Sequence, residues 1–305
     1  MALSDYFKTI DNISDREAQR LRGQVRTYYK QSLDNIQNEL ARLDRKGVLT
    51  HAQMNNYKRL QNLEAFIDKE IGNTAGRSTQ TMKARFRSIY ETSYYRGAYG
   101  LEKTAEAKLG FGLLKKEVIE EAILNPLDRV GFIQRNRENS RALARQLKQE
   151  LTQGLVQGNS YSQIARSVSK RMNKGYRTSV RIVNTETHRI RETAKRRTME
   201  EAQEYGVNMK KRWISTIDGV TRDSHEDLDG VTIPLEEDFE GEHGSGPGPG
   251  QMNSAREDIN CRCTTIAIME GYEPRVRRAR ENDDERGEII GYQNYNEWKA
   301  GRIGS

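Results

Sequence analysis

The chain has 305 residues, of which 31% are charged and 34% are hydrophobic, and its formal net charge is +7. Globular domains usually contain about 45–50% apolar residues, so this composition argues against one large core and favours long amphipathic helices. The N-terminus lacks the apolar run of a signal peptide, and no stretch approaches the ~18 apolar residues of a membrane span. We therefore expect a protein that is made in the cytoplasm and has no membrane segment.

The first two-thirds of the chain has the pattern of long helices. Pro126 is the only proline among the first 233 residues, and proline is the strongest helix breaker. A capping box at 14–17, followed by apolar residues at spacings of three and four, predicts a helix that ends at Gly47. Thr50 starts a second predicted helix, which ends near Gly72. Further helices are predicted at about 81–99, just before Pro126, and at about 142–157.

The segment 158–172 has two interpretations. A helix, a glycine turn and a short basic helix are the pattern of a helix-turn-helix that reads DNA. The same pattern is typical of an ordinary helix corner whose apolar residues face inward, and we favour this corner. A long helix is then predicted over about 178–205, with Gly206 as its end.

After Gly206 the apolar residues alternate, which is typical of strands. Short strands are predicted at about 211–217, 231–233 and 260–268, and the glycine- and proline-rich run 241–250 is expected to be a flexible loop. The predicted fold is therefore mainly α, with three parts. These are an elongated helical body over 1–157, a module over 158–270 whose small α+β part begins at about 206, and a charged tail over 271–305.

The two cysteines are candidate metal ligands. Cys261 and Cys263 are two residues apart on a predicted strand, so their side chains point to the same face, and His225 is a candidate third ligand. Thiolate and imidazole are the preferred ligands of zinc. The alternative is two small buried cysteines and a histidine that hydrogen-bonds a neighbour. We expect no cofactor, and a structural zinc ion is the competing hypothesis. Candidate fourth ligands are His243, Asp223, Asp227 and Asp258.

A polar group lies inside the predicted helix 178–205. Glu186, His188 and Arg189 cannot all share one helix face, and buried charges need partners. We expect Glu186 and Arg189 to pair with the 218–223 segment, so that Arg222 and Asp223 complete a structural polar cluster. An acid, a histidine and an arginine can also form a catalytic site, but we favour the structural interpretation.

The same helix and the residues just after it are basic, with nine Lys or Arg against five Glu between Arg181 and Arg212. Its candidate contacts to DNA phosphates are Arg189, Lys195, Arg196 and Arg197. A solvated helix face is the alternative explanation of these charges. Four tyrosines are expected in a core or a protein interface rather than stacked on bases: Tyr90, Tyr94, Tyr95 and Tyr99.

From residue 183 onward the sequence resembles the phage Mu F-like head-morphogenesis family. The pieces that carry the resemblance are, in order, Val183–Arg189, Tyr205–Gly206, Trp213–Asp218, Thr221–His225, Leu228–Gly230 and Ile259–Cys263. The resemblance covers about 158–268, and the helical part before it is similar only in general pattern. Some members have a histidine before the Asn-Cys-Arg run where this chain has Asp258, which removes a convenient metal ligand.

The resemblance implies a minor head protein (minor capsid protein) of a tailed bacteriophage, present in few copies in the virion. The partners it implies are the portal protein, capsid or scaffolding proteins, and double-stranded DNA bound without sequence preference. The helical body is expected to supply the protein–protein contacts, inside the head near the portal. Some members carry enzyme domains after this module, but about 37 residues follow Ile268, so we expect no enzyme. The alternative function is a metal-dependent nuclease, or another enzyme, that uses the His, Asp and Cys cluster of the C-terminal module.

Overall fold

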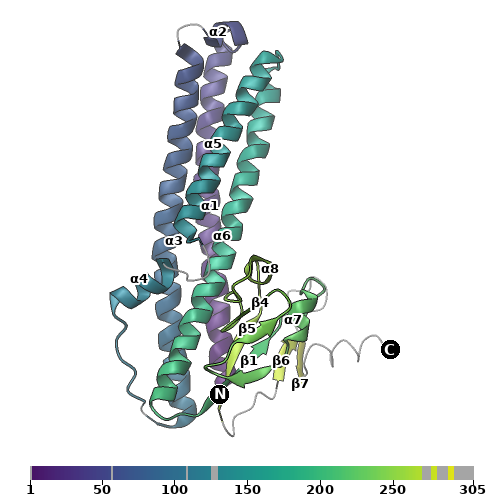
Figure 1. Ribbon diagram of the computed structural model, residues 1–305. Coiled ribbons are helices and arrows are strands. Elements are labelled where there is room, and N and C mark those ends of the chain that lie inside the picture. The colour runs from purple at the N-terminus through teal and green to yellow at the C-terminus, as the bar shows by residue number, and fades with distance from the viewer. Residues whose placement is uncertain are drawn as a thin grey trace. The chain divides into compact units, whose positions relative to one another are not determined.

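The computed structural model describes residues 2–55, 58–107, 109–124, 130–269, 276–279 and 288–291. The chain folds into two compact units, each built from several stretches of sequence. Unit 1 comprises Met1–Glu17, Phe86–Arg129 and Asn184–Ser305, and unit 2 comprises Ala18–Arg85 and Val130–Val183. Three long helices contribute residues to both units (Figure 1): α1 (Leu3–Arg45), α3 (Arg59–Ala105) and α6 (Tyr161–Glu204).

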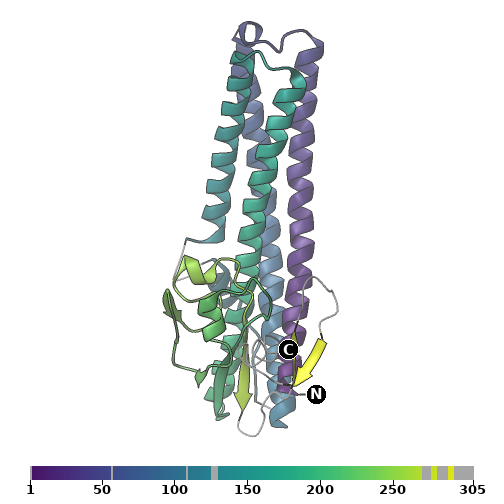
Figure 2. The ribbon, with the colours of Figure 1, turned by 90° about the vertical axis from the view of Figure 1, so that its right-hand side faces the viewer.

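Unit 2 is a helix bundle. Its parts of α1, α3 and α6 lie side by side with helix α5 (Phe132–Val156), as both ribbon views show (Figure 1, Figure 2). The short α2 (His51–Asn55) precedes α3. Apolar side chains at helical spacing fill the centre and include Leu21, Val25, Ile36 and Leu40 of α1 and Leu143, Leu147 and Leu151 of α5.

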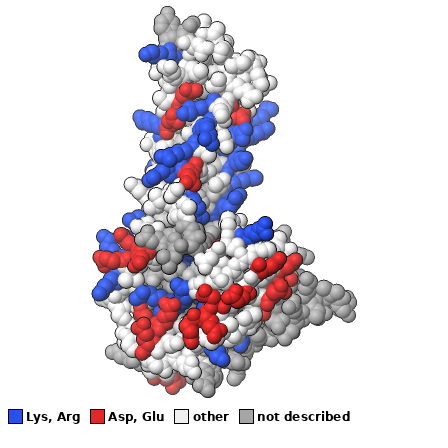
Figure 3. Space-filling view, in the orientation of Figure 1, with Lys and Arg blue, Asp and Glu red and all other residues white. Residues whose placement is uncertain are grey.

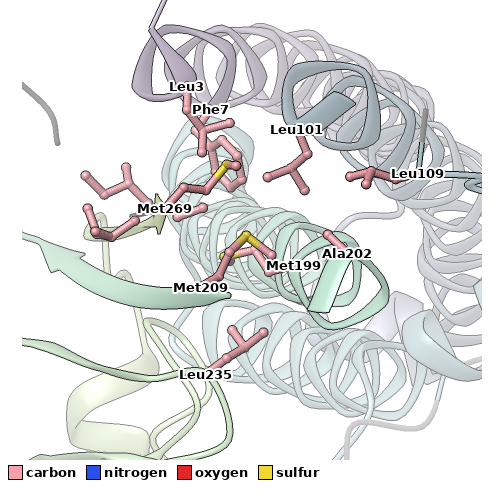
Figure 4. Packing of buried hydrophobic residues seen from close by; sticks show 12 residues of the cluster. Leu3, Phe7, Leu101, Leu109, Met199, Ala202, Met209, Leu235 and Met269 are labelled. Carbon is pink, nitrogen blue, oxygen red and sulfur yellow. The ribbon is translucent and has the colours of Figure 1, made fainter. Parts of the chain in front are cut away.

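Unit 1 packs helices against a small antiparallel sheet. The strand order is β2 (Thr232–Pro234), β1 (Met209–Ile214), β5 (Thr264–Met269). Figure 4 shows the apolar cluster in which α1, α3 and α6 meet these strands, including Leu3, Phe7, Leu101, Met199, Ala202, Met209 and Met269. The C-terminal part of α6 packs against these strands through Met199 and Ala202. This packing gives the three short strands a core that they do not have by themselves.

Short elements complete unit 1. Helix α4 (Lys116–Leu124) lies between α3 and α5 in sequence. Around the sheet are α7 (Asp223–Asp227), β3 (Phe239–Gly241), β4 (Gly244–Gly246) and α8 (Ala255–Asp258). Within the predicted tail, β6 (Val276–Ala279) pairs antiparallel with β7 (Glu288–Gly291), and the remainder of 271–305 lies outside the described residues.

The glycine-rich run 241–250 was expected to be a flexible loop, and this expectation is wrong. Gly244–Gly246 form strand β4, which pairs with β3. A Cβ atom on Gly246 would lie 1.8 Å from the carbonyl oxygen of Gln251, so the chain folds back on itself more closely than any other residue allows. Lys211 of β1 also anchors the run, because its Nζ donates to the carbonyl oxygen of Pro247 at 3.0 Å.

The predicted mainly α fold with a small α+β module is confirmed, but several of the predicted helix ends are wrong. Helix α1 begins at Leu3, and the predicted cap residue Ser14 is buried inside it. Helix α3 continues through Gly72. These signals failed because tertiary packing of the flanking apolar residues outweighs local capping preference and the helix cost of one glycine, about 1 kcal/mol.

The favoured interpretation of 158–172 as a helix corner is confirmed. Ser160 and Gln163 form a capping box, in which the Ser160 N–H donates to Gln163 Oε1 at 2.8 Å, and α6 then continues unbroken to Glu204. The described residues contain no separate recognition helix here. The boundary predicted at residue 157 also differs from the compact units, because stretches of 1–157 belong to both. None of the described helices combines the length and apolarity that crossing a membrane requires.

Two glycines of α3 provide a test of the helix packing. A Cβ on Gly100 would lie 2.7 Å from Cβ of Tyr6, whereas a Cβ on Gly76 would meet open space. We expect Gly100→Ala to destabilise the protein by about 1–3 kcal/mol through overpacking. Gly76→Ala should stabilise it by about 0.5–1 kcal/mol, because alanine loses less backbone entropy in a helix. Urea unfolding of both variants measures the difference, and a stabilising Gly100→Ala would contradict the close approach of α1 and α3.

Candidate functional site

The middle of α6 carries charged side chains into the core of unit 1. Lys195 is fully buried, and its Nζ lies 3.1 Å from carboxylate oxygens of both Asp11 in α1 and Glu192 in α6. The Glu192 carboxylate also accepts hydrogen bonds from the backbone N–H of Thr265 (3.0 Å), from Thr265 Oγ1 (2.7 Å) and from Arg191 Nε (2.9 Å). This network therefore connects α1, α6 and β5.

The electrostatics of the network keep Glu192 ionised. Burial by itself would raise the pKa of the Glu192 carboxyl, but Lys195 and Arg191 outweigh burial and hold that pKa well below its usual range. Burial would likewise lower the pKa of Arg191, yet the carboxylates of Asp11 and Glu192 raise it. The cations of this face of α6 are therefore neutralised inside the protein.

The predicted polar cluster is divided, and its expected pairing is wrong. Arg189 lies 3.0 Å from Glu186, and its guanidinium donates to the carbonyl oxygens of Ala122 (3.0 Å) and Ile123 (3.3 Å) at the end of α4. The last carbonyls of a helix have no partner inside the helix, so a buried arginine can stabilise them. His188 Nε2 lies 2.5 Å from the carbonyl oxygen of Cys263. Burial lowers the pKa of His188.

The other two members of the predicted cluster lie together at the start of α7, where Arg222 is the N-cap, but the Arg222 side chain reaches another helix. Arg222 donates to the carbonyl oxygens of Glu257 and Ile259 at the end of α8. Asp223 is the first residue of α7. Arg189 and Arg222 therefore donate hydrogen bonds to the ends of two short helices. The predicted pairing of Arg189 with the 218–223 segment does not occur.

A histidine and both cysteines meet beside the sheet. His225 Nδ1 lies 3.7 Å from Cys261 Sγ and 3.3 Å from Cys263 Sγ, and the three candidate ligand atoms all lie within 4.8 Å of one another. On the opposite side of the ring, His225 Nε2 lies 2.8 Å from Glu257 Oε2. All four side chains are buried.

The local backbone explains how the two sulfurs converge. The prediction that both cysteines lie on a strand is wrong, because β5 begins only at Thr264. Asn260 adopts a left-handed conformation with φ +56°, and the Cys261 N–H donates to the carbonyl oxygen of Asp258 at 3.2 Å. This turn presents both thiols to α7. They belong to a small core together with Trp213, Leu228, Phe239 and Met252.

The three groups shift one another's ionisation. Burial would raise the pKa of Cys263, but its hydrogen bonds with Cys261, His225 and Ser215 outweigh burial and lower that pKa well below its usual range. Burial and the neighbouring Cys263 both raise the pKa of Cys261. For His225, burial would lower the pKa, and Cys263 and Glu257 outweigh that effect and raise it.

A pocket of about 240 Å³ opens next to this cluster. Its lining includes His225 and Cys263 together with Thr216, Val220, Thr221, Arg222, Asn260 and Arg262. Arg262 is held in place by Asp218, whose Oδ1 accepts from Nη2 at 2.8 Å. Two cationic side chains therefore border a pocket whose inner wall carries a thiol and an imidazole.

The predicted DNA contacts on α6 are largely internal. Arg189 and Lys195 are only 4% and 0% exposed and are paired within the protein, so their prediction as DNA contacts is wrong. Arg196 and Arg197 are partly exposed, but their Nε atoms lie 3.3 and 2.8 Å from carboxylates one turn later in the same helix. The composition of this helix could not reveal which of its basic side chains point inward.

Positive charge instead gathers in unit 2. Unit 2 contains 24 Lys and Arg against 8 Asp and Glu, a formal net charge of +16. Unit 1 contains 27 Lys and Arg against 36 Asp and Glu, which is −9. In the space-filling view, Lys and Arg gather over α5 and its neighbouring helices within unit 2 (Figure 3). The net charge of +7 conceals this separation.

A row of basic residues on α5 was not among the residues predicted to contact DNA. Arg137, Arg141, Arg145 and Lys148 follow one another at spacings of four, four and three, and with α3 they line a groove of about 640 Å³. Lys148 Nζ lies 2.9 Å from Asp68. The three arginines are exposed, and no ion pair joins them to another described residue. Their periodicity, opposite the apolar stripe of the same helix, was the available signal.

Comparison with known proteins identifies relatives along nearly the whole chain. A family model described as "Phage Mu protein F like protein" matches residues 145–266. The chain is 30% identical over 293 residues to "Minor head protein GP7" of Bacillus phage SPP1, covering 96% of this chain and 94% of that protein. It is 29% identical over 302 residues to an Enterococcus faecalis protein named "NAD(+)--arginine ADP-ribosyltransferase EFV". That match covers 99% of this chain but 61% of the enterococcal protein. No solved structure matches the chain.

The buried carboxylate of Glu192 should make stability depend on pH. At neutral pH, Glu192→Gln leaves two buried cations short of a counter-charge and should cost about 3–5 kcal/mol. The folded-state pKa lies below the ordinary glutamate value of 4.5, so the unfolded chain takes up the proton first and wild-type stability falls as the pH drops below about 4.5. The variant should lose less stability over that acidic range.

Urea unfolding between pH 3 and pH 7 measures this difference. Glu200→Gln is the matched control, because Glu200 lies on the same helix in a pair that is half exposed. Parallel stability profiles for wild type and Glu192→Gln would contradict the assigned role of the network.

Proposed function

The chain belongs to the phage Mu protein F-like family and is a bacteriophage minor head protein, and from this premise we propose how it works in the head. Unit 2 contacts packaged double-stranded DNA through its basic surface. Unit 1 contacts other head proteins, among them the portal. The protein is made in the host cytoplasm and takes its place inside the head near the portal.

The observation that carries the DNA proposal is the separation of charge between the units. A net charge of +16 on unit 2 attracts a polyanion, whereas the −9 of unit 1 repels one. DNA is therefore expected to meet the protein at unit 2. This assignment replaces the α6 residues Arg189 and Lys195, whose charges are paired with internal partners.

The α5 row has a spacing suited to phosphates. Arg137, Arg141 and Arg145 are four residues apart, which corresponds to a rise of about 6 Å between neighbours. Phosphates two steps apart on one DNA strand are separated by about 6.8 Å along the axis. Contacts of this kind go to the backbone and carry no sequence information, so binding should be independent of sequence.

The contact to head proteins is proposed at an apolar surface of unit 1 around Leu113. Leu113 is 89% exposed, and Tyr95 and Tyr99 of α3 are 40% and 54% exposed. Tyr95 Oη accepts from the backbone N–H of Leu114 at 3.0 Å, which holds this segment against α3. Exposed aromatic and apolar side chains of this kind are enriched in protein interfaces. Tyr90 and Tyr94, by contrast, are buried.

We propose further that the protein acts structurally rather than as an enzyme. Glu186 and Arg189, the acid and the arginine of α6 that resemble a catalytic group, are engaged with each other and with a helix end, and His188 bonds a carbonyl. The nuclease alternative depends on the cluster around His225. Incubating the protein with duplex and single-stranded DNA and Mg²⁺, Mn²⁺ or Zn²⁺ tests it, and cleavage that disappears in Cys263→Ser would favour the nuclease.

Removing two arginines from α5 should weaken DNA binding in a salt-dependent way. For Arg141→Gln/Arg145→Gln, we expect a lower affinity and a log–log salt slope that is shallower by about 0.9 for each phosphate that the variant no longer neutralises. The control is Arg196→Gln/Arg197→Gln, which removes the same charge from unit 1 and should change binding little. Equal effects of the two double variants on affinity and slope would contradict the α5 surface.

A charge on the apolar surface of unit 1 should impair assembly. Leu113→Glu is expected to reduce the amount of protein recovered in purified heads and bound to portal rings, because it places a carboxylate in an apolar interface. Val156→Glu is the control, since Val156 is 62% exposed and belongs to unit 2. Normal incorporation of Leu113→Glu would exclude this surface.

A further inference from the structure

The cluster beside the sheet has the composition of a metal site. We propose that His225 Nδ1, Cys261 Sγ and Cys263 Sγ bind one zinc ion, and that the fourth coordination position opens to the pocket that Thr216, Arg222 and Arg262 line. The proposal is independent of the DNA and head contacts above, because none of these side chains takes part in them.

The two nitrogen–sulfur distances are close to those of a tetrahedron around zinc. With Zn–S of about 2.3 Å and Zn–N of about 2.05 Å, tetrahedral geometry puts sulfur and nitrogen about 3.6 Å apart. The observed separations from His225 Nδ1 are 3.7 Å to Cys261 and 3.3 Å to Cys263. The three side chains therefore need little movement to receive the ion. Two thiolates and a neutral imidazole are ligands that select zinc over harder cations.

The carboxylate next to His225 is placed as it is beside many metal-bound histidines. Metal-bound histidines usually donate their second ring N–H to a carboxylate, which fixes the tautomer and orients the ring. Here Glu257 Oε2 lies within ion-pair distance of Nε2, at 2.8 Å, although the N–H is not aligned for a hydrogen bond, and the same oxygen accepts from Ser224 Oγ at 2.9 Å. Glu257 is fully buried, and this arrangement leaves Nδ1 directed at the two sulfurs.

The charge of the loaded site suits its buried position. Two thiolates balance the charge of one zinc ion, so no net charge is added to the small core around Trp213. The ion would also join α7 to the 261–263 segment, which are otherwise connected through more than thirty residues of chain. Small modules with a thin apolar core gain stability from such a connection.

The fourth position is the distinctive part of the site. Among the described residues, no further Cys, His, Asp or Glu joins the three ligands. His225 and Cys263 instead form part of the wall of the pocket of about 240 Å³, which is large enough for water. The arginines that border the pocket favour anions there. A water molecule therefore completes the coordination, and a small anion can displace it.

Metal content of the full-length protein tests the ligand set. Protein purified without chelator is expected to contain about one zinc per chain by elemental analysis, and Cys261→Ser and Cys263→Ser should lose it. His243→Ala is the control, because His243 lies in the same module outside the cluster and should keep the metal. Metal-free wild type that is fully folded and does not take up added Zn²⁺ would overturn the proposal, as would full retention in both cysteine variants.

A milder variant separates loss of metal from loss of fold. Glu257→Gln keeps all three ligands and should weaken zinc affinity by about 10–100-fold in competition with a chelator dye, with an unchanged far-UV circular dichroism spectrum. An unchanged affinity would show that Glu257 does not support a metal ligand and would count against the site.

Cobalt tests the open position. The Co²⁺-substituted protein should show thiolate-to-cobalt charge transfer and the strong visible bands of a tetrahedral site. Added azide should shift the visible bands, because it replaces the water at the fourth position. Bands that do not respond to azide would show that the site is closed and would overturn the open position.

Discussion

The carboxylate of Glu192 is the group on which unit 1 depends. It receives hydrogen bonds and charge from Lys195 and Arg191 in its own helix and from both the backbone and the side chain of Thr265 in β5. A buried charge is costly unless every partner is present, so the network specifies one arrangement of α6 against the strand. His188 lies one turn earlier, where it reaches the carbonyl oxygen of Cys263. The position of the cysteine segment thus follows from the register of α6 on the sheet.

The protein uses its basic residues in two opposite ways. In unit 1, Arg189, Arg191 and Lys195 are buried and bind carboxylates or helix-end carbonyls, which occupies their hydrogen bonds and neutralises their charge. In unit 2, the arginines of α5 remain exposed along a groove. Only the second kind is available to a polyanion, and this difference explains how a modest net charge produces a strongly basic surface.

Polar side chains that resemble a catalytic group form hydrogen bonds and ion pairs within the fold. Glu186 and Arg189 of α6 pair with each other, Arg189 also donates to the end of α4, and His188 bonds the carbonyl oxygen of Cys263. Arg222 donates to carbonyl oxygens at the end of α8. The His225 cluster differs, because its three groups point at one another and border a pocket. Family membership as a minor head protein and a metal in this cluster are compatible, since a bound ion can stabilise a module that has few apolar residues.

Sequence periodicity by itself determined that the chain is mainly helical and that a small α+β module begins near residue 206, because both features follow from local spacing. For the segment 158–172 it left two interpretations, and the structure decided for the helix corner. The sequence also selected His225, Cys261 and Cys263 by their chemistry. Tertiary structure alone decided that α1 continues through Ser14 and α3 through Gly72, because packing against neighbouring helices outweighs local stop signals. It likewise decided which charges are neutralised internally: Lys195 and Arg145 look alike in the sequence, but one is buried against Glu192 and the other lines an exposed groove. Which side of a helix meets a partner depends on contacts between residues that are far apart in the chain, and no local pattern records them.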